Sequence, residues 1–188
     1  MRIAIIGGIG SGKSEALKAA RDFGLATLSA DEINAELLAS SGYAERLEKL
    51  FPTAVENGVV NKKTLAGIVF ADATARERLN AVSHPLILKA IENDVRDPLV
   101  VEVPLILESG AARLFDEIII VATPLEKRIE RLEASRNMTK AEVQARIDAQ
   151  VGEDALKQVA TRTVLNDSTV QALRERVEEI LKNILSKA

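Results

Sequence analysis

Apolar residues gather in five short runs along the chain. Three of them are residues 3–6, 99–103 and 117–122, and two shorter ones are residues 25–28 and 163–165. A strand that is buried on both faces of a sheet has a nearly continuous apolar sequence, whereas a half-exposed strand alternates apolar and polar residues. We therefore predict five strands that belong to one parallel sheet.

Between these runs, apolar residues recur every three or four positions, which is the spacing of one face of an α-helix. No strand pattern returns between residues 28 and 99, so residues 32–96 are predicted to form an all-helical insertion. Strands that alternate with helices favour an α/β fold with a doubly wound parallel sheet, whose site lies at the carboxyl ends of the strands. The predicted helices cover residues 14–23, 31–39, 43–51, 64–70, 74–82, 85–95, 124–132, 139–150, 152–160 and 168–185. Asn61 is a predicted N-cap, and Thr139 with Glu142 a predicted capping box.

Composition narrows the class of protein. The 188 residues suffice for one cooperative unit with a full core, and the aromatic content of 3% leaves Leu, Ile, Val and Ala to fill it. The net charge of -3 argues against general binding of nucleic acid, because such binding needs a basic face. The chain has no cysteine, which excludes disulfides and thiolate metal sites. We also read neither a signal peptide nor a membrane span, and expect a cytoplasmic protein that is a monomer or a weak homo-oligomer.

The first apolar run leads directly into residues 7–14, Gly-Gly-Ile-Gly-Ser-Gly-Lys-Ser. This sequence matches the phosphate loop G-x-x-x-x-G-K-[ST], in which glycines let backbone N–H groups face one anion at the start of a helix. Lys13 is placed to reach the β- and γ-phosphates of ATP, and Ser14 to bind Mg²⁺. Glu15 lies in the first helical turn, either near the α-phosphate or directed away from it. This interpretation assigns ATP binding to Gly8, Ile9, Gly10, Ser11, Gly12, Lys13, Ser14 and Glu15.

Two acidic residues follow other predicted strands and should lie near the same edge of the sheet. Asp31 comes after residues 25–28, where it could accept the proton of an attacking hydroxyl group, or cap a helix, or do both. Glu102 lies inside an apolar run, where an unpaired carboxylate would be costly. It is therefore expected either near Mg²⁺ or paired with Lys13 when the site is empty.

Basic residues offer candidate contacts for phosphate groups. Arg128, Arg131, Arg136 and Arg146 lie on a predicted helical hairpin, which could close over the γ-phosphate or merely form solvated helix surface. Lys62 could bind an anionic acceptor or be an ordinary surface lysine. His84, the only histidine, precedes Pro85 and could orient a substrate phosphate or cap a helix.

Several short motifs follow one another along the chain. They are residues 7–14, Ala30-Asp31, Val-Phe-Ala-Asp at 69–72, His-Pro-Leu-Ile at 84–87, Val-Pro-Leu-Ile-Leu-Glu-Ser-Gly at 103–110, Arg146 with Gln150, and Leu165-Asn166. Taken together, these motifs resemble the dephospho-CoA kinase family in register over nearly the whole chain. The resemblance implies a nucleotide-binding core, a helical acceptor domain, a lid, and transfer of the ATP γ-phosphate to the ribose 3′-hydroxyl of dephospho-CoA.

The resemblance also implies roles for residues and segments. Asp31 matches the catalytic base of the family, and Lys13 and Arg136 are the other expected catalytic residues. Asn166 is expected at the ATP site, and the acceptor contacts are expected from Asp31, Lys62, His84, Pro104, Leu105 and Arg146. The core is expected to comprise residues 1–31, 97–125 and 156–188, the acceptor domain residues 32–96, and the lid residues 126–155.

The chain departs from the family pattern at a few positions. Glu15 replaces a usual Thr, Ser29 replaces an Asp, and Asn61-Lys62 replaces an Asp-Arg pair, while Arg136 lies one residue from the expected position. Two other functions therefore stay open. One is a phosphate-loop kinase for another small metabolite or nucleotide, and the other is a regulatory NTP-binding switch. A GTPase switch should carry an Asn-Lys-x-Asp motif, and Asn61-Lys62 is not followed by such an Asp.

Overall fold

The computed structural model describes residues 1–136 and 139–187, and for residues 135 and 136 it describes the backbone only. A five-stranded parallel sheet forms its centre, with the strand order β2-β5-β1-β6-β7. The prediction of a doubly wound parallel sheet with five strands is therefore confirmed. The strands are β1 (Arg2–Ile6), β2 (Ala26–Ser29), β5 (Leu99–Glu102), β6 (Glu117–Ala122) and β7 (Arg162–Leu165).

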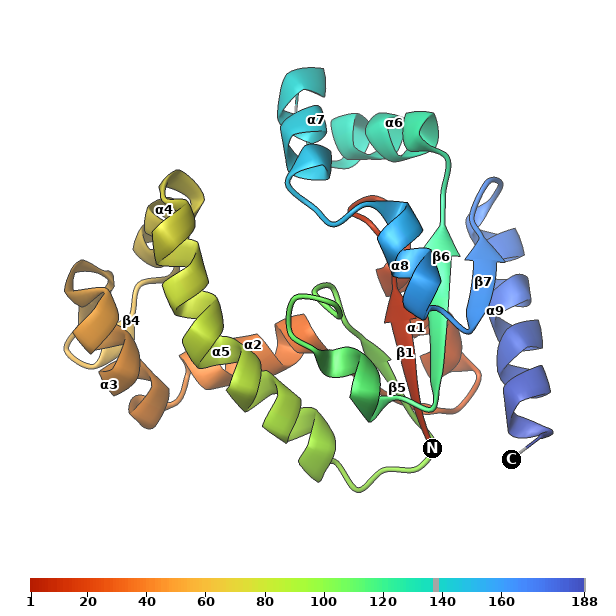
Figure 1. Ribbon diagram of the computed structural model, residues 1–188, viewed down its shortest axis with the longest axis horizontal. Helices are drawn as coiled ribbons and strands as arrows, with labels where there is room; N and C mark the ends of the chain where they lie inside the picture. Colours follow the sequence, from red (N-terminus) through yellow and green to blue (C-terminus); the bar gives the residue numbers. More distant parts are fainter. Residues whose placement is uncertain (137–138, 188) are drawn as a thin grey trace. The chain divides into compact units, whose positions relative to one another are not determined.

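Both faces of this sheet are covered, which explains the continuous apolar runs. Ile3 and Ile5 of β1 point to one face, and Ala4 and Ile6 point to the other, yet all four are fully buried. Helices α1 (Lys13–Asp22) and α9 (Val170–Leu185) pack against each other and against the first face. Figure 1 shows these two helices beside the sheet, with α8 (Glu153–Val159) in front of β6.

The segment between β6 and β7 is helical. It comprises α6 (Leu125–Arg136), α7 (Lys140–Asp148) and α8, and a 3₁₀ turn, η2 (Ala111–Leu114), precedes β6. Thr139 and Glu142 form the predicted capping box at the start of α7. Among the described residues, no helix has the length and apolar content that a membrane crossing requires.

Residues 30–94 form a second compact unit, separate from the unit of residues 1–29 and 95–188. Its core is an apolar cluster centred on Tyr43, Leu47 and Phe51. Asn61 caps α4 as predicted, because its side chain accepts a hydrogen bond from the backbone N–H of Thr64. The elements of this unit are α2 (Ala30–Leu38), α3 (Ser41–Leu50), η1 (Pro52–Ala54), β3 (Val55–Glu56), β4 (Val59–Val60), α4 (Lys62–Ala71) and α5 (Ala73–Asn93).

Two details of this unit correct the sequence analysis. Residues 32–96 are not all-helical, because β3 and β4 form an antiparallel hairpin around Asn57 and Gly58, which have φ angles of 52° and 75°. A second helix was predicted to begin at Pro85, but α5 continues through it. The apolar side chains on both sides of this residue, Val82 and Leu86, pack against the same cluster, and this packing outweighs the backbone hydrogen bond that proline cannot make.

Candidate active site at the phosphate loop

The phosphate loop connects the central strand β1 to helix α1. Gly10 and Gly12 have φ angles of 76° and 97°, which a residue with a side chain rarely adopts. Gly12 is also the N-cap of α1, and no side chain within the described residues caps the helix there. The first N–H groups of α1 and its positive dipole end are therefore available to an anion.

Buried polar side chains hold the far side of this loop. The Asn166 amide donates from Nδ2 to the carbonyl oxygen of Ser11 at 2.7 Å, and the Thr123 hydroxyl donates to the same oxygen at 2.9 Å. A Cβ atom on Gly12 would lie 2.4 Å from Asn166 Nδ2, so only glycine permits this contact. Arg131 in turn donates to Asn166 Oδ1 at 3.1 Å. Asn166, which was predicted at the ATP site, thus lies directly against the loop.

Lys13 and Ser14 begin α1, as their predicted roles require. The Lys13 ammonium donates to the carbonyl oxygen of Gly8 at 3.2 Å and so lies along the loop. The Ser14 hydroxyl forms a long hydrogen bond of 3.4 Å to Glu102 Oε1 at the end of β5. A hydroxyl and a carboxylate oxygen are ligands that suit Mg²⁺, which usually keeps several water ligands. No cluster of three or more His, Cys, Asp or Glu residues suited to a metal exists within the described part of the chain.

The carboxylate of Glu15 forms an ion pair with a residue that the sequence analysis did not consider. Arg174 on α9 donates from one terminal nitrogen to Glu15 Oε2 and from the other to Asp22 Oδ2, both at 3.1 Å. Glu15 is half-exposed, with 42% of its side chain accessible. Of the two positions considered for Glu15, the observed contact with α9 supports the one directed away from the α-phosphate.

Two side chains from the helical segment between β6 and β7 hold the peptide groups of Ile9. The Ile9 N–H donates to Gln150 Oε1 at 2.7 Å, and the Ile9 carbonyl oxygen accepts from Arg128 Nε at 2.8 Å. Sequence reasoning missed both contacts. The Gln150 contact had a signal, because this residue belongs to the Arg146-Gln150 motif, whereas Arg128 was only one of several arginines in the segment.

Four other predicted residues belong to the unit that contains the phosphate loop, and the structure places two of them beside the loop. Pro104 and Leu105 line a small cleft together with Gly7, Gly8 and Gln150, so they lie beside the phosphate loop. Arg146 is exposed in the last turn of α7. The side chain of Arg136 lies outside the described residues, so its catalytic role stays a prediction.

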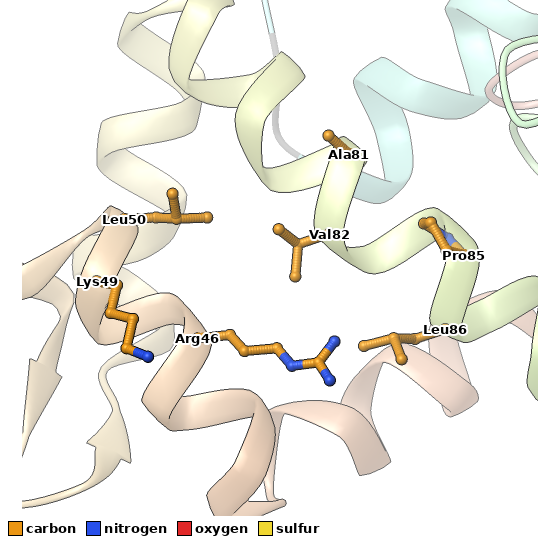
Figure 2. A pocket seen from close by; sticks show the side chains of 7 residues that line it. All are labelled: Arg46, Lys49, Leu50, Ala81, Val82, Pro85 and Leu86. Carbon is orange, nitrogen blue, oxygen red and sulfur yellow. The ribbon is translucent and has the colours of Figure 1, made fainter.

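Three predicted residues belong to the helical unit. Asp31 is exposed in the first turn of α2, and Lys62 opens α4 directly after its cap, Asn61. His84 lies in the middle of α5, so the hypothesis that it caps a helix is wrong. A groove of about 380 Å³ lies between α3 and α5 of this unit, and Figure 2 shows the side chains of Arg46 and Lys49 beside its apolar wall. Leu50, Ala81, Val82, Pro85 and Leu86 form that wall.

The comparisons with known proteins agree on one family. A model of the family described as "Dephospho-CoA kinase" matches residues 1–172. Dephospho-CoA kinase of Thermus thermophilus is 33% identical over 190 residues, which cover 99% of this chain and 93% of that protein. The enzyme of Dehalococcoides mccartyi is 29% identical, over 99% of this chain and 98% of that protein.

Solved structures show the same fold. A crystal structure of a Thermus thermophilus protein is 31% identical and has a TM-score of 0.81, and the match covers 100% of this chain and 97% of the other. Shikimate kinase from Acinetobacter baumannii, solved in complex with shikimate, has a TM-score of 0.58 at 14% identity, over 99% of this chain and 93% of that one, so it shows the fold alone. The match of the family model to nearly the whole chain and the complete phosphate loop lead to one assignment: this chain belongs to the dephospho-CoA kinase family.

Proposed function

We propose that this chain transfers the γ-phosphoryl group of ATP to the ribose 3′-hydroxyl of dephospho-CoA, giving coenzyme A and ADP. The family match over residues 1–172 carries this proposal, and the intact phosphate loop supports it. The alternatives, a kinase for another metabolite and a regulatory NTP-binding protein, are not favoured, because the relatives matched over the full length are dephospho-CoA kinases.

The phosphate loop binds ATP in this proposal. The N–H groups at the start of α1 hold the β-phosphate, and Lys13, whose ammonium now rests on the Gly8 carbonyl oxygen, moves to the β- and γ-phosphates. Ser14 and Glu102, which contact each other, would hold Mg²⁺ with water as the other ligands. The metal ion would neutralise negative charge on the phosphates.

Asp31 is the proposed general base. Its carboxylate accepts the proton of the 3′-hydroxyl as the oxygen attacks the γ-phosphorus, and the bond to the β-phosphate oxygen breaks. Arg136 contacts the transferred phosphoryl group from the lid, residues 126–155, and Arg146 of the same lid contacts the acceptor. Lys62, His84, Pro104 and Leu105 contact the acceptor, which binds to the helical domain of residues 32–96. A cytoplasmic location fits a soluble metabolic kinase and belongs to the same proposal.

The test measures ADP formation from ATP with dephospho-CoA beside a panel of nucleosides, nucleotides and shikimate. We expect turnover with dephospho-CoA only, and a product with the mass of coenzyme A. The matched control is Lys13→Ala, which removes the charge that reaches the phosphates and should abolish transfer while the circular dichroism spectrum stays unchanged. Faster turnover with another acceptor, or near-normal turnover in Lys13→Ala, would contradict the proposal.

A further inference from the structure

Arg128 is a buried cation that lies against the phosphate loop. Only 8% of its surface is exposed, and its Nε donates to the Ile9 carbonyl oxygen at 2.8 Å. Its guanidinium group lies directly over Gly8, where a Cβ atom would be 2.4 Å from Nη2 and 2.7 Å from Cζ. Any side chain at position 8 would displace this group, so the glycine serves the arginine as well as the loop.

The terminal nitrogens of Arg128 have hydrogen-bonding capacity to spare. Within the described residues, Nη1 and Nη2 make no hydrogen bond and no ion pair, and the side chain is anchored through Nε alone. Burial lowers the pKa of Arg128, and the negative charge of Glu153 partly offsets this effect. The Glu153 carboxylate, however, is bonded to Lys157 at 2.9 Å. A buried cation without a hydrogen-bonded carboxylate is costly, which points to an anionic ligand.

Two positive charges converge on the same residue of the loop. The Lys13 ammonium donates to the Gly8 carbonyl oxygen, and the Arg128 guanidinium group lies over the same glycine. Gly8 and Arg128 also line one small cavity together with Gln150, Gly152 and Glu153. Two cations beside one loop residue favour the binding of an anion there. The anion that the phosphate loop is built to hold is the terminal phosphates of a nucleotide.

We propose that Arg128 is a catalytic residue that contacts the γ-phosphoryl group during transfer. The inference rests on the proposed kinase function and adds a residue to it. With Nε fixed on Ile9, the guanidinium would donate from Nη1 and Nη2 to oxygens of the transferred group, where negative charge is spread in the transition state. The β-phosphate, in contrast, is held by the N–H groups at the start of α1.

A purely structural role for Arg128 makes a different forecast. Arg128 and Gln150 both hold the Ile9 peptide groups, one at the carbonyl oxygen and the other at the N–H. If Arg128 only supported the loop, its loss would weaken the binding of ATP and the binding of ADP equally. The loss of Gln150 would have the same effect. A contact with the γ-phosphoryl group would instead affect ATP and spare ADP, because ADP lacks that group.

The experiment compares Arg128→Gln with the control Gln150→Ala, using calorimetric Kd values for ATP and ADP and kcat with dephospho-CoA. For Arg128→Gln we expect an ATP Kd about tenfold weaker, an ADP Kd within about twofold of wild type, and a kcat lowered by about 10²–10³. Gln150→Ala should leave the ratio of the two Kd values unchanged. Equal weakening of ATP and ADP by Arg128→Gln, or an unchanged kcat, would overturn the proposal.

A second variant keeps the test decisive if Arg128→Gln fails to fold. Arg128→Lys retains the positive charge but lacks the planar fork of the guanidinium group. It should therefore bind ATP less tightly relative to ADP than the wild-type chain does. The two Kd values do not depend on the acceptor. A failure of the proposed function would therefore show as absent coenzyme A formation in the wild-type chain, whereas a failure of the Arg128 proposal would show as an unchanged ATP-to-ADP ratio.

Discussion

At the scale of single residues, Glu15 raises an electrostatic question. A carboxylate in the first turn of α1 is favourable for the helix dipole but repels the phosphates that the same helix end would bind. Arg174 resolves this conflict, because one terminal nitrogen of its guanidinium group pairs with Glu15 and the other pairs with Asp22. The pair neutralises the acidic side chain before any nucleotide arrives. The arginine of α9 therefore makes Glu15 compatible with a phosphate site.

This arrangement predicts opposite results for the two partners. Glu15→Thr removes a charge that is already neutralised, so the ATP Kd should stay within about twofold of wild type. Arg174→Met leaves Glu15 unpaired near the phosphates and should weaken ATP binding by on the order of 1 kcal/mol. The double variant should recover wild-type affinity. Calorimetric titration of the three proteins with ATP checks this.

Asp22→Asn serves as the matched control, because it breaks the other arm of the same fork and lies far along α1 from its first turn. It should leave the ATP Kd unchanged. A double variant as weak as Arg174→Met alone would show that Arg174 acts on ATP by a route that does not involve Glu15.

At the scale of elements, α7 depends on the capping box at its start. Thr139 and Glu142 bond each other reciprocally, and these hydrogen bonds are the main reason that the pKa of Glu142 lies below its ordinary value. A carboxylate whose pKa is lowered in the folded state stabilises the fold at pH values above its unfolded pKa. This contribution is lost as the pH falls through the pKa of the folded state. The first turn of α7 should therefore loosen in acid.

We predict that Thr139→Ala raises amide hydrogen exchange in the first turn of α7 at neutral pH, because the N–H group of Glu142 loses its partner, the Thr139 hydroxyl. In the wild-type chain, corrected for intrinsic rates, the same amides should keep their protection at neutral pH and lose it only in acid, as the pH falls below the ordinary pKa of a glutamate. Mass spectrometry of the peptides from this segment measures both effects. The N-cap Thr169 of α9 provides a control, since exchange there should be the same in both proteins. Equal protection of α7 in both proteins would show that the box is dispensable.

Elements with strong local signals could be predicted from the sequence, and those decided by packing could not. The apolar runs of β1, β5 and β6 predicted a sheet that is covered on both faces. The prediction of Asn61 as an N-cap was correct, because a cap bonds to a residue only three positions away. The hairpin of β3 and β4 was missed because two residues per strand give no alternation. The helix break expected at Pro85 was wrong, because apolar contacts of α5 override a local rule.

The same distinction applies to the candidate site. Residues 7–14 act on each other and on the helix that follows, so their motif predicted the loop and its glycine conformations. Arg128 and Gln150 reach Ile9 across 119 and 141 positions of the chain, and no local pattern encodes such contacts. Similarly, the partner of Glu15 lies 159 positions away. Long-range side-chain contacts are thus the part of this site that only the structure supplies.

At the scale of the whole molecule, the proposed reaction draws on both compact units. The phosphate loop, Glu102 and Arg128 belong to residues 1–29 and 95–188, whereas Asp31, Lys62 and His84 belong to residues 30–94. ATP binding should therefore be a property of the first unit, and acceptor activation a property of the second. Asp31 lies in the second unit, next to its first residue. A substitution there should separate ATP binding from phosphoryl transfer.

Asp31→Asn supplies that separation. Asparagine keeps the size of the side chain but cannot accept the proton of the 3′-hydroxyl, so kcat should fall by about 10²–10⁴ while the ATP Kd stays within a few fold. Glu32→Gln is the matched control, since it removes the same charge from the next residue of α2, which is also exposed, and should leave kcat near wild type. The melting temperature should barely change in either variant, because both positions are exposed on the helix surface. If Asp31→Asn turned over dephospho-CoA normally, Asp31 would not be the base, and its carboxylate would serve only the first turn of α2.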